Sequence, residues 1–533
     1  MTTKILSTFA CILSAISLTA CSEDTFGPDP AKDWAGTSSF FNSTDDKGFL
    51  TYYTPTIGRC GDPMPFYDQN EEEFKVLYLQ EYDNNGPCYH PIWGVSTKDG
   101  ANYESLGEVI PTGQSIYEAD AALGTGCAVY NEQDGLYYIY YTGHTAKEVV
   151  MRATSPDFKT WTKDNAWMLE GADYGYSEKD FRDPQVFKTD DGQWHMIISS
   201  NLKFAEFKST DLKNLEHVGQ FNMFWGRMLE CPDVFKMGNK WYLVYSEALR
   251  EPWSRKVKYV MADSWDGLKS AISNPNFPAD GKEGVLDSRA FYAGKTASNG
   301  TDRYIWGWCP YRIGATLHDK NINVGAQGEP AWSGALVCHR IIQHEDGTLT
   351  LGEVPAFDEK YDDEQVVAVM DSHGYNDGVL SGDDAYVLFN RLGYQNHISM
   401  TIKTSNNWDK FGISFVRSTD PDFYYTMVVN PEWEDGRKIN FEQEGYRITI
   451  NDKGEEEKEY GKGFVEGIDG YVFARPADNT YHIDIYTDNS VMVMYINDNV
   501  CYTQRIYGIQ KNCWSINNYG GTITVSDVEV SWQ

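Results

Sequence analysis

The hydrophobic pattern between residues 48 and 357 consists of short apolar runs separated by polar turns. Aromatic and β-branched side chains dominate the runs, as in residues 74–80 and 136–141, and Asp-Gly, Gly-Asn or Asn-Gly pairs occur between them. Runs of this length and composition, bounded by such turns, are typical of β-strands and hairpins. We find no long stretch with the 3.6-residue period of an amphipathic helix. The pattern therefore predicts an all-β fold.

One β unit recurs within this region. A short apolar strand leads through a polar turn into an aromatic-rich strand, as in residues 181–187 followed by 194–200. Similar units open near residues 61, 126, 230 and 287. The copies lie roughly fifty to sixty-five residues apart, a spacing typical of propeller blades or solenoid turns. We count five copies and predict a five-bladed β-propeller over residues 48–357.

The pattern changes after an acidic run at residues 358–364. Polar and apolar residues alternate cleanly in residues 481–486 and 491–496, and the polar residues between them predict a hairpin. A further strand is predicted at residues 523–530, close to the end of the chain. Alternation of this kind is typical of strands with one buried face. We predict a C-terminal β-sandwich over residues 365–533.

The N-terminal residues 1–20 have the form of a signal peptide, because an apolar run follows Lys4 and small residues follow the run. The run is too short to span a bilayer. The sequence Leu18-Thr19-Ala20-Cys21 resembles the lipobox of bacterial lipoproteins, which implies that a lipid on Cys21 anchors the protein to the outer membrane or cell surface. The polar residues 21–47 would then form a flexible tether. An ordinary cleaved signal peptide with a chance cysteine is the alternative.

Acidic residues outnumber basic ones by 78 to 45, so the formal net charge is −33 at pH 7. This charge disfavours a nucleic-acid partner, because binding to phosphates requires a basic surface. A neutral ligand such as a sugar is compatible with it. Neither the cysteines nor the histidines show the spacing of a zinc site, and we expect no metal and no cofactor. For the cysteines after Cys21, disulfides and buried free thiols are both compatible with the wide spacing.

Three carboxylates occupy corresponding places in the repeated units. Asp62, Asp183 and Glu230 each stand where a blade opens, and the inner strands of a propeller face one central channel. We therefore expect these side chains to meet at one mouth of the channel. Like charges confined in one place oppose each other's ionisation, so such a cluster indicates a catalytic site. An Asp before Pro is by itself most often a turn residue, which is the alternative for Asp62 and Asp183.

The ordered motifs resemble glycoside hydrolase family 32, the invertase, levanase and inulinase group. Its members carry an Asp-Pro, an Arg-Asp-Pro and a Glu-Cys motif on a five-bladed propeller with a C-terminal sandwich. This chain has Asp62-Pro63, Arg182-Asp183-Pro184 and Glu230-Cys231 in the same order. Further matching segments are residues 140–143, 286–293, 332–334 and 340–347. The resemblance covers nearly the whole mature chain.

The resemblance implies a retaining glycosidase in which Asp62 is the nucleophile and Glu230 is the acid/base. Such a reaction needs an ionised carboxylate that attacks the anomeric carbon and a carboxyl group about 5 Å away that protonates the leaving oxygen. Asp183, with Arg182 beside it, would hold sugar hydroxyls and stabilise the transition state. The other substrate-binding residues that we predict are Gln80, Trp93, Asp287 and Trp332. Blade packing is the alternative for the two tryptophans, and turn capping is the alternative for Asp287.

The chain departs from the family pattern on the side that binds fructose. Gly61 stands where the family has an asparagine that touches the sugar, and Arg289 occupies a usual glycine. Three functions are compatible with these changes. The first is a surface-anchored β-fructosidase that acts with retention on fructans, fructo-oligosaccharides or sucrose. The second is an arabinanase- or xylosidase-type propeller glycosidase, which inverts with carboxyl groups roughly 6.5–9.5 Å apart, and the third is a non-catalytic glycan-binding lipoprotein.

The preference for β-2,6 or β-2,1 linkages and for endo or exo cleavage depends on the depth of the pocket. That depth is set by loops, which the hydrophobic pattern does not place. The sequence therefore predicts the class of reaction and leaves the linkage open.

Overall fold

The computed structural model is built almost entirely of β-strands. Its described part contains one α-helix, α3 (Trp265–Ile272), which has eight residues. The predicted all-β fold is confirmed. The residues that the structure describes are 49–82, 86–223, 228–248, 256–274, 283–310, 332–417, 420–433, 438–451, 453–462, 472–506, 509–510 and 512–533.

The predicted signal peptide (1–20), the lipidation site Cys21 and the tether (21–47) lie outside the described residues. Within the described ranges, no helix combines the length and the apolar character needed to cross a membrane.

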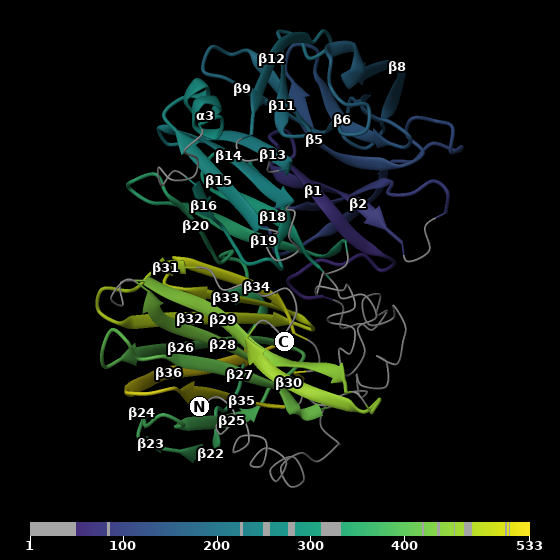
Figure 1. Cartoon of the computed structure of the whole chain (residues 1–533). Coiled ribbons are helices and arrows are strands. Elements are labelled where there is room, and N and C mark those ends of the chain that lie inside the picture. Colours follow the sequence, from purple (N-terminus) through teal and green to yellow (C-terminus); the bar gives the residue numbers. More distant parts are fainter. Residues whose placement is uncertain are drawn as a thin grey trace.

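As far as the chain is described, the N-terminal domain is a β-propeller of five four-stranded blades (Figure 1). Neighbouring strands within a blade are antiparallel. The first and last blades are joined where Cys60 on β1 pairs with Gly334 on β19, which closes the ring. The predicted five-bladed propeller is therefore confirmed.

The strands of the five blades, in chain order, are β1 (Arg59–Asp68), β2 (Glu73–Glu81), β3 (Ile92–Thr97) and β4 (Glu104–Ile110); β5 (Leu123–Asn131), β6 (Leu136–His144), β7 (Glu148–Ser155) and β8 (Thr162–Glu170); β9 (Arg182–Lys188), β10 (Trp194–Ser200), β11 (Lys203–Ser209) and β12 (Glu216–Asn222); β13 (Met228–Met237), β14 (Lys240–Ala248), β15 (Lys256–Ala262) and β16 (Glu283–Val285); β17 (Tyr292–Ser298), β18 (Arg303–Pro310), β19 (Gly334–Gln343) and β20 (Leu349–Gly352).

A β-bulge interrupts the first strand of each blade in the described propeller. The pairing register shifts between Gly61 and Met64, Gly124 and Gly126, Arg182 and Gln185, Glu230 and Asp233, and Tyr292 and Lys295. A bulge leaves residues unpaired and re-aims their side chains. Three of the shifts contain a proline, which has no N–H to give to the ladder: Pro63, Pro184 and Pro232. The Asp-Pro motifs are therefore the sequence of a bulge that turns an acidic side chain out of the strand pattern.

The C-terminal domain consists of two antiparallel sheets packed face to face around one core, which confirms the predicted sandwich. The core contains Phe411 and Trp514 from one sheet and Ile485 and Met494 from the other. In the first sheet the strand order is β23-β24-β36-β26-β32-β33-β34, with β21 beside β36. In the second sheet the order is β22-β25-β35-β27-β28-β29-β30, with β31 beside β29.

The sandwich strands are β21 (Asp363–Glu364), β22 (Val369–His373), β23 (Tyr375–Asn376), β24 (Val379–Ser381), β25 (Tyr386–Arg391), β26 (Gln395–Thr404), β27 (Phe411–Arg417), β28 (Asp420–Trp433), β29 (Lys438–Ile450), β30 (Glu456–Lys462), β31 (Val472–Ala474), β32 (Thr480–Asp488), β33 (Val491–Ile496), β34 (Val500–Arg505), β35 (Cys513–Asn518) and β36 (Thr522–Trp532). The predicted hairpin corresponds to β32 and β33, which pair directly. Because β21 already pairs with β36, the sandwich sheet begins two residues before the predicted position 365.

The two domains share a buried interface, along which β33 and β34 lie toward the propeller in Figure 1. Apolar side chains from both domains form one cluster there, with Tyr52 and Phe357 on the propeller side and Tyr486 on the sandwich side. The carboxylate of Asp488 accepts hydrogen bonds from the backbone N–H groups of Thr51 and Tyr52, at 2.7 and 3.0 Å. Directional polar contacts therefore fix the orientation of the sandwich against the propeller.

Candidate active site

The bulged ends of the inner strands converge on a pocket of about 360 Å³. Five of its lining residues are predicted site residues: Asp62, Arg182, Asp183, Glu230 and Trp332. The others are Leu79, Tyr89, His90, Leu123, Gly124, Thr125, His144, Cys231 and Tyr292. Three carboxylates from blades one, three and four therefore meet in one place, as the repeat pattern predicts.

Asp62 is held by one hydrogen bond to each of its carboxylate oxygens. The hydroxyl of Thr125, from the bulge of the second blade, donates to Oδ2 at 2.7 Å. The indole Nε1 of Trp308 on β18 donates to Oδ1 at 2.9 Å. Both donors are neutral, so they orient the carboxylate and leave its charge uncompensated. An oriented carboxylate of this kind is suited to nucleophilic attack.

Glu230 is held in the same way by two side chains. Nη2 of Arg182 donates to Oε1 at 3.0 Å, and the hydroxyl of Tyr292 donates to Oε2 at 2.8 Å. The side chain of Glu230 is 24% exposed, so it can reach a substrate in the pocket. Its position between a cation and a phenol fixes the direction in which a proton can be delivered.

Asp183 is the most deeply buried of the three acids, with 3% of its surface exposed. Its backbone has a φ of 59°, in the left-handed region that only a few non-glycine residues adopt. The backbone N–H of Cys231 donates to its Oδ2 at 2.8 Å. Burial raises the pKa of Asp183 to about 7, with Arg182 and the Cys231 N–H acting against the shift and Glu230 and Asp62 adding to it. Asp183 therefore changes its protonation state near neutral pH.

Arg182 links the pocket to a group of acids behind it. Besides Glu230, its guanidinium donates from Nη1 to Glu148 at 3.2 Å and to Asp180 at 2.5 Å. Burial acts against its charge, but Asp183, Glu230, Glu148 and Asp180 together raise the pKa of Arg182 above its ordinary value. The guanidinium is therefore kept charged and in place, with Nη1 and Nη2 both bound to carboxylates.

The wall beside Asp62 is aromatic. The imidazole of His90 stacks on the indole of Trp332, with ring centroids 4.4 Å apart and an interplanar angle of 26°, and its Nε2 lies 2.6 Å from Oε2 of Glu81. A Cβ atom added at Gly61 would lie 2.3 Å from Cη2 of Trp332. Any side chain at position 61 would therefore collide with this indole. The glycine before Asp62 and the position of Trp332 depend on each other.

Both domains match models of known protein families. Residues 53–354 match the glycosyl hydrolases family 32 N-terminal domain, and residues 347–530 match the model described as GH32, BT1760-like, C-terminal domain. The chain belongs to glycosyl hydrolase family 32.

Two curated levanases align with part of this chain. A levanbiose-producing levanase of Bacillus subtilis (strain 168) is 25% identical over 294 residues, which cover 50% of this chain and 53% of the levanase. A levanbiose-producing levanase of Geobacillus stearothermophilus is 32% identical over 278 residues, covering 46% of this chain and 65% of the levanase. The chain thus spans less than two thirds of the length of these relatives.

Two solved structures share the fold of both domains over most of this chain. The sucrose-6-phosphate hydrolase from Lactobacillus gasseri superposes with a TM-score of 0.67 at 16% identity, covering 94% of this chain and 97% of the other. The exo-inulinase from Aspergillus awamori gives a TM-score of 0.65 at 16% identity, covering 91% and 97%. At this identity the likeness establishes the two-domain architecture.

Three residues predicted to bind substrate do not line the pocket of this family 32 chain. Gln80 is 1% exposed, and its amide donates to the backbone oxygen of Ile57 at 2.6 Å. Trp93 on β3 packs against the core between the blades and the sandwich. Asp287 is completely buried at the domain interface, where the backbone N–H of Thr503 donates to it at 2.8 Å. In this structure Trp93 has the packing role that was the alternative, whereas Gln80 and Asp287 make other buried contacts, Asp287 across the domain interface.

Asp287 lies outside the pocket because the fifth blade is offset from the others. Asp62, Asp183 and Glu230 lie on the inner strands themselves, whereas Asp287 precedes β17. On the inner strand of the fifth blade, the residue that lines the pocket is Tyr292, the first residue of β17. In this blade the bulge between Tyr292 and Lys295 marks the position that corresponds to the acids of the other blades.

Sequence reasoning did not assign Thr125, Tyr292 or Trp308, although each contacts a pocket carboxylate. Thr125 lies in the second-blade bulge, between the two glycines Gly124 and Gly126, and this position in the repeat was a usable signal. Trp308 lies at the end of an aromatic strand, where nothing in the sequence distinguishes it from a core residue.

Proposed function

We propose that this chain hydrolyses β-fructofuranosyl linkages in fructans, fructo-oligosaccharides or sucrose, with retention of configuration at the anomeric carbon. The observation that carries the proposal is the pocket in which Asp62, Asp183 and Glu230 meet, each on a bulged inner strand of a family 32 propeller. The relatives named levanase, and the raffinose invertase of Escherichia coli with 27% identity over 265 residues, support fructosides as the substrate class.

In the first step, the ionised carboxylate of Asp62 attacks the anomeric carbon of the fructosyl unit. The glycosidic C–O bond breaks, and protonated Glu230 gives its proton to the leaving oxygen. The product is a fructosyl ester of Asp62 and a released alcohol. In the second step Glu230, now ionised, takes a proton from water, whose oxygen displaces Asp62. Fructose or a fructo-oligosaccharide leaves with its original anomeric configuration.

The neighbours of the two carboxylates suit these roles. Thr125 and Trp308 hold Asp62 with neutral donors, so its negative charge is available for attack. Arg182 and Tyr292 hold Glu230 and keep it aimed at the pocket. Fixed donors of this kind need no reorganisation when charge develops in the transition state.

Asp183 is proposed to bind the hydroxyl groups of the fructosyl unit. With a pKa near 7, it can accept a hydrogen bond as a carboxylate or donate one as a carboxylic acid at neutral pH. Trp332, stacked on His90, offers an apolar face for the sugar ring. Both residues lie beside the position at which Asp62 would attack.

The charge of the pocket supports an uncharged sugar. Among its described lining residues, Arg182 is the one that carries a permanent positive charge, and it is already paired with Glu230, Glu148 and Asp180. Asp62 and the other two carboxyl groups, where they are ionised, would repel a phosphorylated substrate. The neutral fructosides therefore fit the pocket better than their phosphate esters.

The experiment that tests the proposal is sugar release by the purified protein from levan, inulin, sucrose and an arabinan control, run beside Glu230→Gln. We expect hydrolysis of at least one fructoside, abolished in the variant, and a preference among levan and inulin that gives the linkage. Proton NMR of the first product should show the retained anomer. Hydrolysis of arabinan alone, or an inverted product, would support the arabinanase type, and no release from any substrate would support a binding protein.

We further propose that Cys21 carries a lipid that anchors the protein at the outer membrane or cell surface. The support is the resemblance of residues 18–21 to a lipobox and the apolar run that precedes it. Expression of the full chain and of Cys21→Ser in a Gram-negative host, with Triton X-114 partition and metabolic labelling with a fatty acid, tests it. Wild-type protein should be labelled and enter the detergent phase, and the variant should do neither.

A further inference from the structure

One strand of the sandwich contacts both propeller segments that carry partners of the proposed catalytic carboxylates. This strand is β34, residues Val500–Arg505. One segment leads to Tyr292, which donates to Glu230, and the other ends beside Trp308, which donates to Asp62. The contacts to the two segments differ in kind.

The first contact joins Asp287 to Thr503. The backbone N–H of Thr503 donates to Oδ1 of Asp287 at 2.8 Å, and its hydroxyl donates to Oδ2 at 2.5 Å. In the opposite direction, the hydroxyl of Ser288 donates to the backbone oxygen of Thr503 at 2.5 Å. All three residues are completely buried, so water does not compete for these bonds. The start of the segment is therefore fastened to β34 by these three hydrogen bonds and by a longer one from the thiol of Cys501 to Oδ2 of Asp287 at 3.5 Å.

The fastened segment is short and internally ordered up to the pocket. The hydroxyl of Ser288 accepts from the N–H of Ala290 at 3.1 Å, and its carbonyl accepts from the N–H of Phe291 at 3.3 Å. Tyr292 follows directly and reaches Glu230 with its hydroxyl at 2.8 Å. Because only four residues, joined by turn hydrogen bonds, separate Asp287 from Tyr292, we expect a displacement at Asp287 to reach this hydroxyl.

The second contact joins Arg505 to the end of β18. Its guanidinium donates from Nη2 to the backbone oxygen of Cys309 at 2.7 Å and from Nε to that of Pro310 at 3.0 Å. Trp308 precedes these two residues, and its indole reaches Oδ1 of Asp62. Because Arg505 is 1% exposed, its charge is satisfied largely by such contacts.

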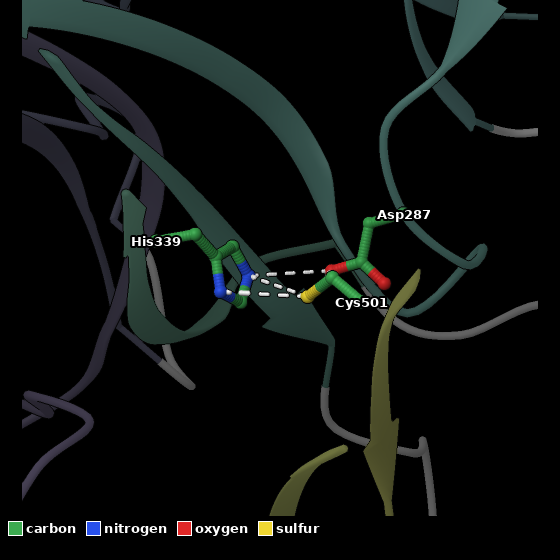
Figure 2. Close-up of side chains that lie close together, drawn as sticks. All are labelled: Asp287, His339 and Cys501. Carbon is green, nitrogen blue, oxygen red and sulfur yellow. Dashed lines mark hydrogen bonds and ion pairs between the residues drawn. The ribbon is translucent and has the colours of Figure 1, made fainter. Parts of the chain in front are cut away.

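Figure 2 shows the polar cluster at the centre of the interface, in which Asp287 and His339 of the propeller meet Cys501 of β34. The three residue types can bind metals, but the sulfur lies 3.5 and 3.8 Å from the two nitrogens of the imidazole. The sulfur is thus beside the ring, and one ion could not lie on a nitrogen lone pair and also bind the sulfur. Nδ1 of His339 lies 2.8 Å from the hydroxyl of Tyr495. The cluster is a hydrogen-bonded part of the domain contact.

We propose that β34 positions the catalytic pair across the domain boundary, through Thr503 and Asp287 for Glu230 and through Arg505 for Asp62. The sandwich then acts on catalysis through the geometry of the two carboxylates, and Asp287, Thr503 and Arg505 are positioning residues. This inference rests on the proposed glycosidase function. It explains why an aspartate that does not line the pocket occurs in the segment that ends at Tyr292.

The test compares Thr503→Val with two matched variants. Thr503→Ser keeps the hydroxyl that donates to Asp287, and Thr350→Val removes another interdomain hydrogen bond, from Thr350 on β20 to the backbone oxygen of Asp498 at 2.6 Å. We expect Thr503→Val to lower kcat about tenfold with little change in KM, because the loss falls on the transition state. Thr503→Ser should recover most of the activity, and Thr350→Val should keep it. Equal kcat in Thr503→Val and Thr350→Val would overturn the proposal.

Arg505→Lys tests the second contact, since lysine keeps the charge but cannot donate to two carbonyl groups in a fork. The expected result is again a lower kcat at an unchanged KM. A rise in KM with kcat retained would overturn this half of the proposal, because it would place the effect on substrate binding.

Hydrogen exchange followed by mass spectrometry provides a readout that does not depend on activity. Peptides covering residues 286–294 should exchange faster in folded Thr503→Val than in folded Thr350→Val, which matches it in chemistry. Unchanged exchange in these peptides would overturn the proposal. If the wild type hydrolyses no substrate, the proposed function fails, and the exchange experiment still decides whether β34 holds the segment.

Discussion

Tyr292 and Trp308 face each other on the paired strands β17 and β18, and their rings lie 5.5 Å apart at 67°. The two side chains donate hydrogen bonds to different carboxylates, Tyr292 to Glu230 and Trp308 to Asp62. Both rings are buried. One aromatic pair therefore contacts both the proposed nucleophile and the proposed acid/base, whose separation is the quantity on which retention depends.

Removing the hydroxyl of Tyr292 is expected to slow catalysis without preventing substrate binding. Tyr292→Phe keeps the ring packed against Trp308 and deletes the hydrogen bond to Glu230, so kcat should fall about tenfold, as for the loss of one hydrogen bond to a charged group. Steady-state kinetics on sucrose or levan measure the effect. Tyr138→Phe is the control, because its hydroxyl contacts Asp134 at 2.7 Å and Tyr138 does not line the pocket. A similar loss in both variants would show a general effect of tyrosine removal.

Replacing Asp62 by asparagine is expected to lower kcat by at least about a thousandfold, because the amide cannot form the covalent intermediate. Thr125 can still donate to the amide oxygen, so the pocket should keep its shape. The control is Asp68→Asn on the same strand, where the carboxylate accepts from the hydroxyl of Tyr137 at 2.9 Å and lies outside the pocket. This control should retain activity even if its melting temperature falls. Undiminished hydrolysis by Asp62→Asn would remove Asp62 from the mechanism.

The raised pKa of Asp183 predicts how stability depends on pH. In the folded chain the pKa is about 7, against an ordinary value of 3.8, so the folded state keeps a proton that the unfolded state releases between these values. The contribution of Asp183 to the free energy of unfolding therefore falls as the pH rises from 3.8 to about 7. Asp183→Asn cannot ionise, and its melting temperature should fall less than that of the wild type between pH 4 and pH 8. Identical pH profiles of the melting temperature in the two proteins would contradict the assignment.

Because Gly61 lies against Trp332, we expect a second substitution at Trp332 to restore part of the substrate binding that a substitution at Gly61 removes. Gly61→Ala places a methyl group against the indole and forces Trp332 to move, which should raise KM for fructosides about tenfold or more, since small displacements in a site are costly. The closest atoms are Cη2, Cζ2 and Cζ3 on the outer edge of the indole, which lie farther from Cβ than the ring of a phenylalanine reaches. The double variant Gly61→Ala/Trp332→Phe should therefore bind substrate better than Gly61→Ala alone. Additive losses in the double variant would show that the two positions act independently.

The all-β class, the five blades and the sandwich could be predicted because they depend on local patterns. Alternation and turn residues mark strands wherever they lie in space, and a repeat of one unit implies a ring of similar blades. The order of Asp62, Asp183 and Glu230 along these units was enough to predict that they would meet. For the three acids, the prediction needed only the position of each residue within its own blade.

The sequence by itself determined which strands form and which acids stand at their inner ends, because these properties follow from the local pattern and from prolines that force a bulge. Tertiary structure decided the partners of these acids. Thr125 and Trp308 reach Asp62 from other blades, and Asp287 turns away from the pocket to bind Thr503 of the sandwich. Such contacts join residues up to 246 positions apart and depend on how blades and domains pack, for which no local pattern exists.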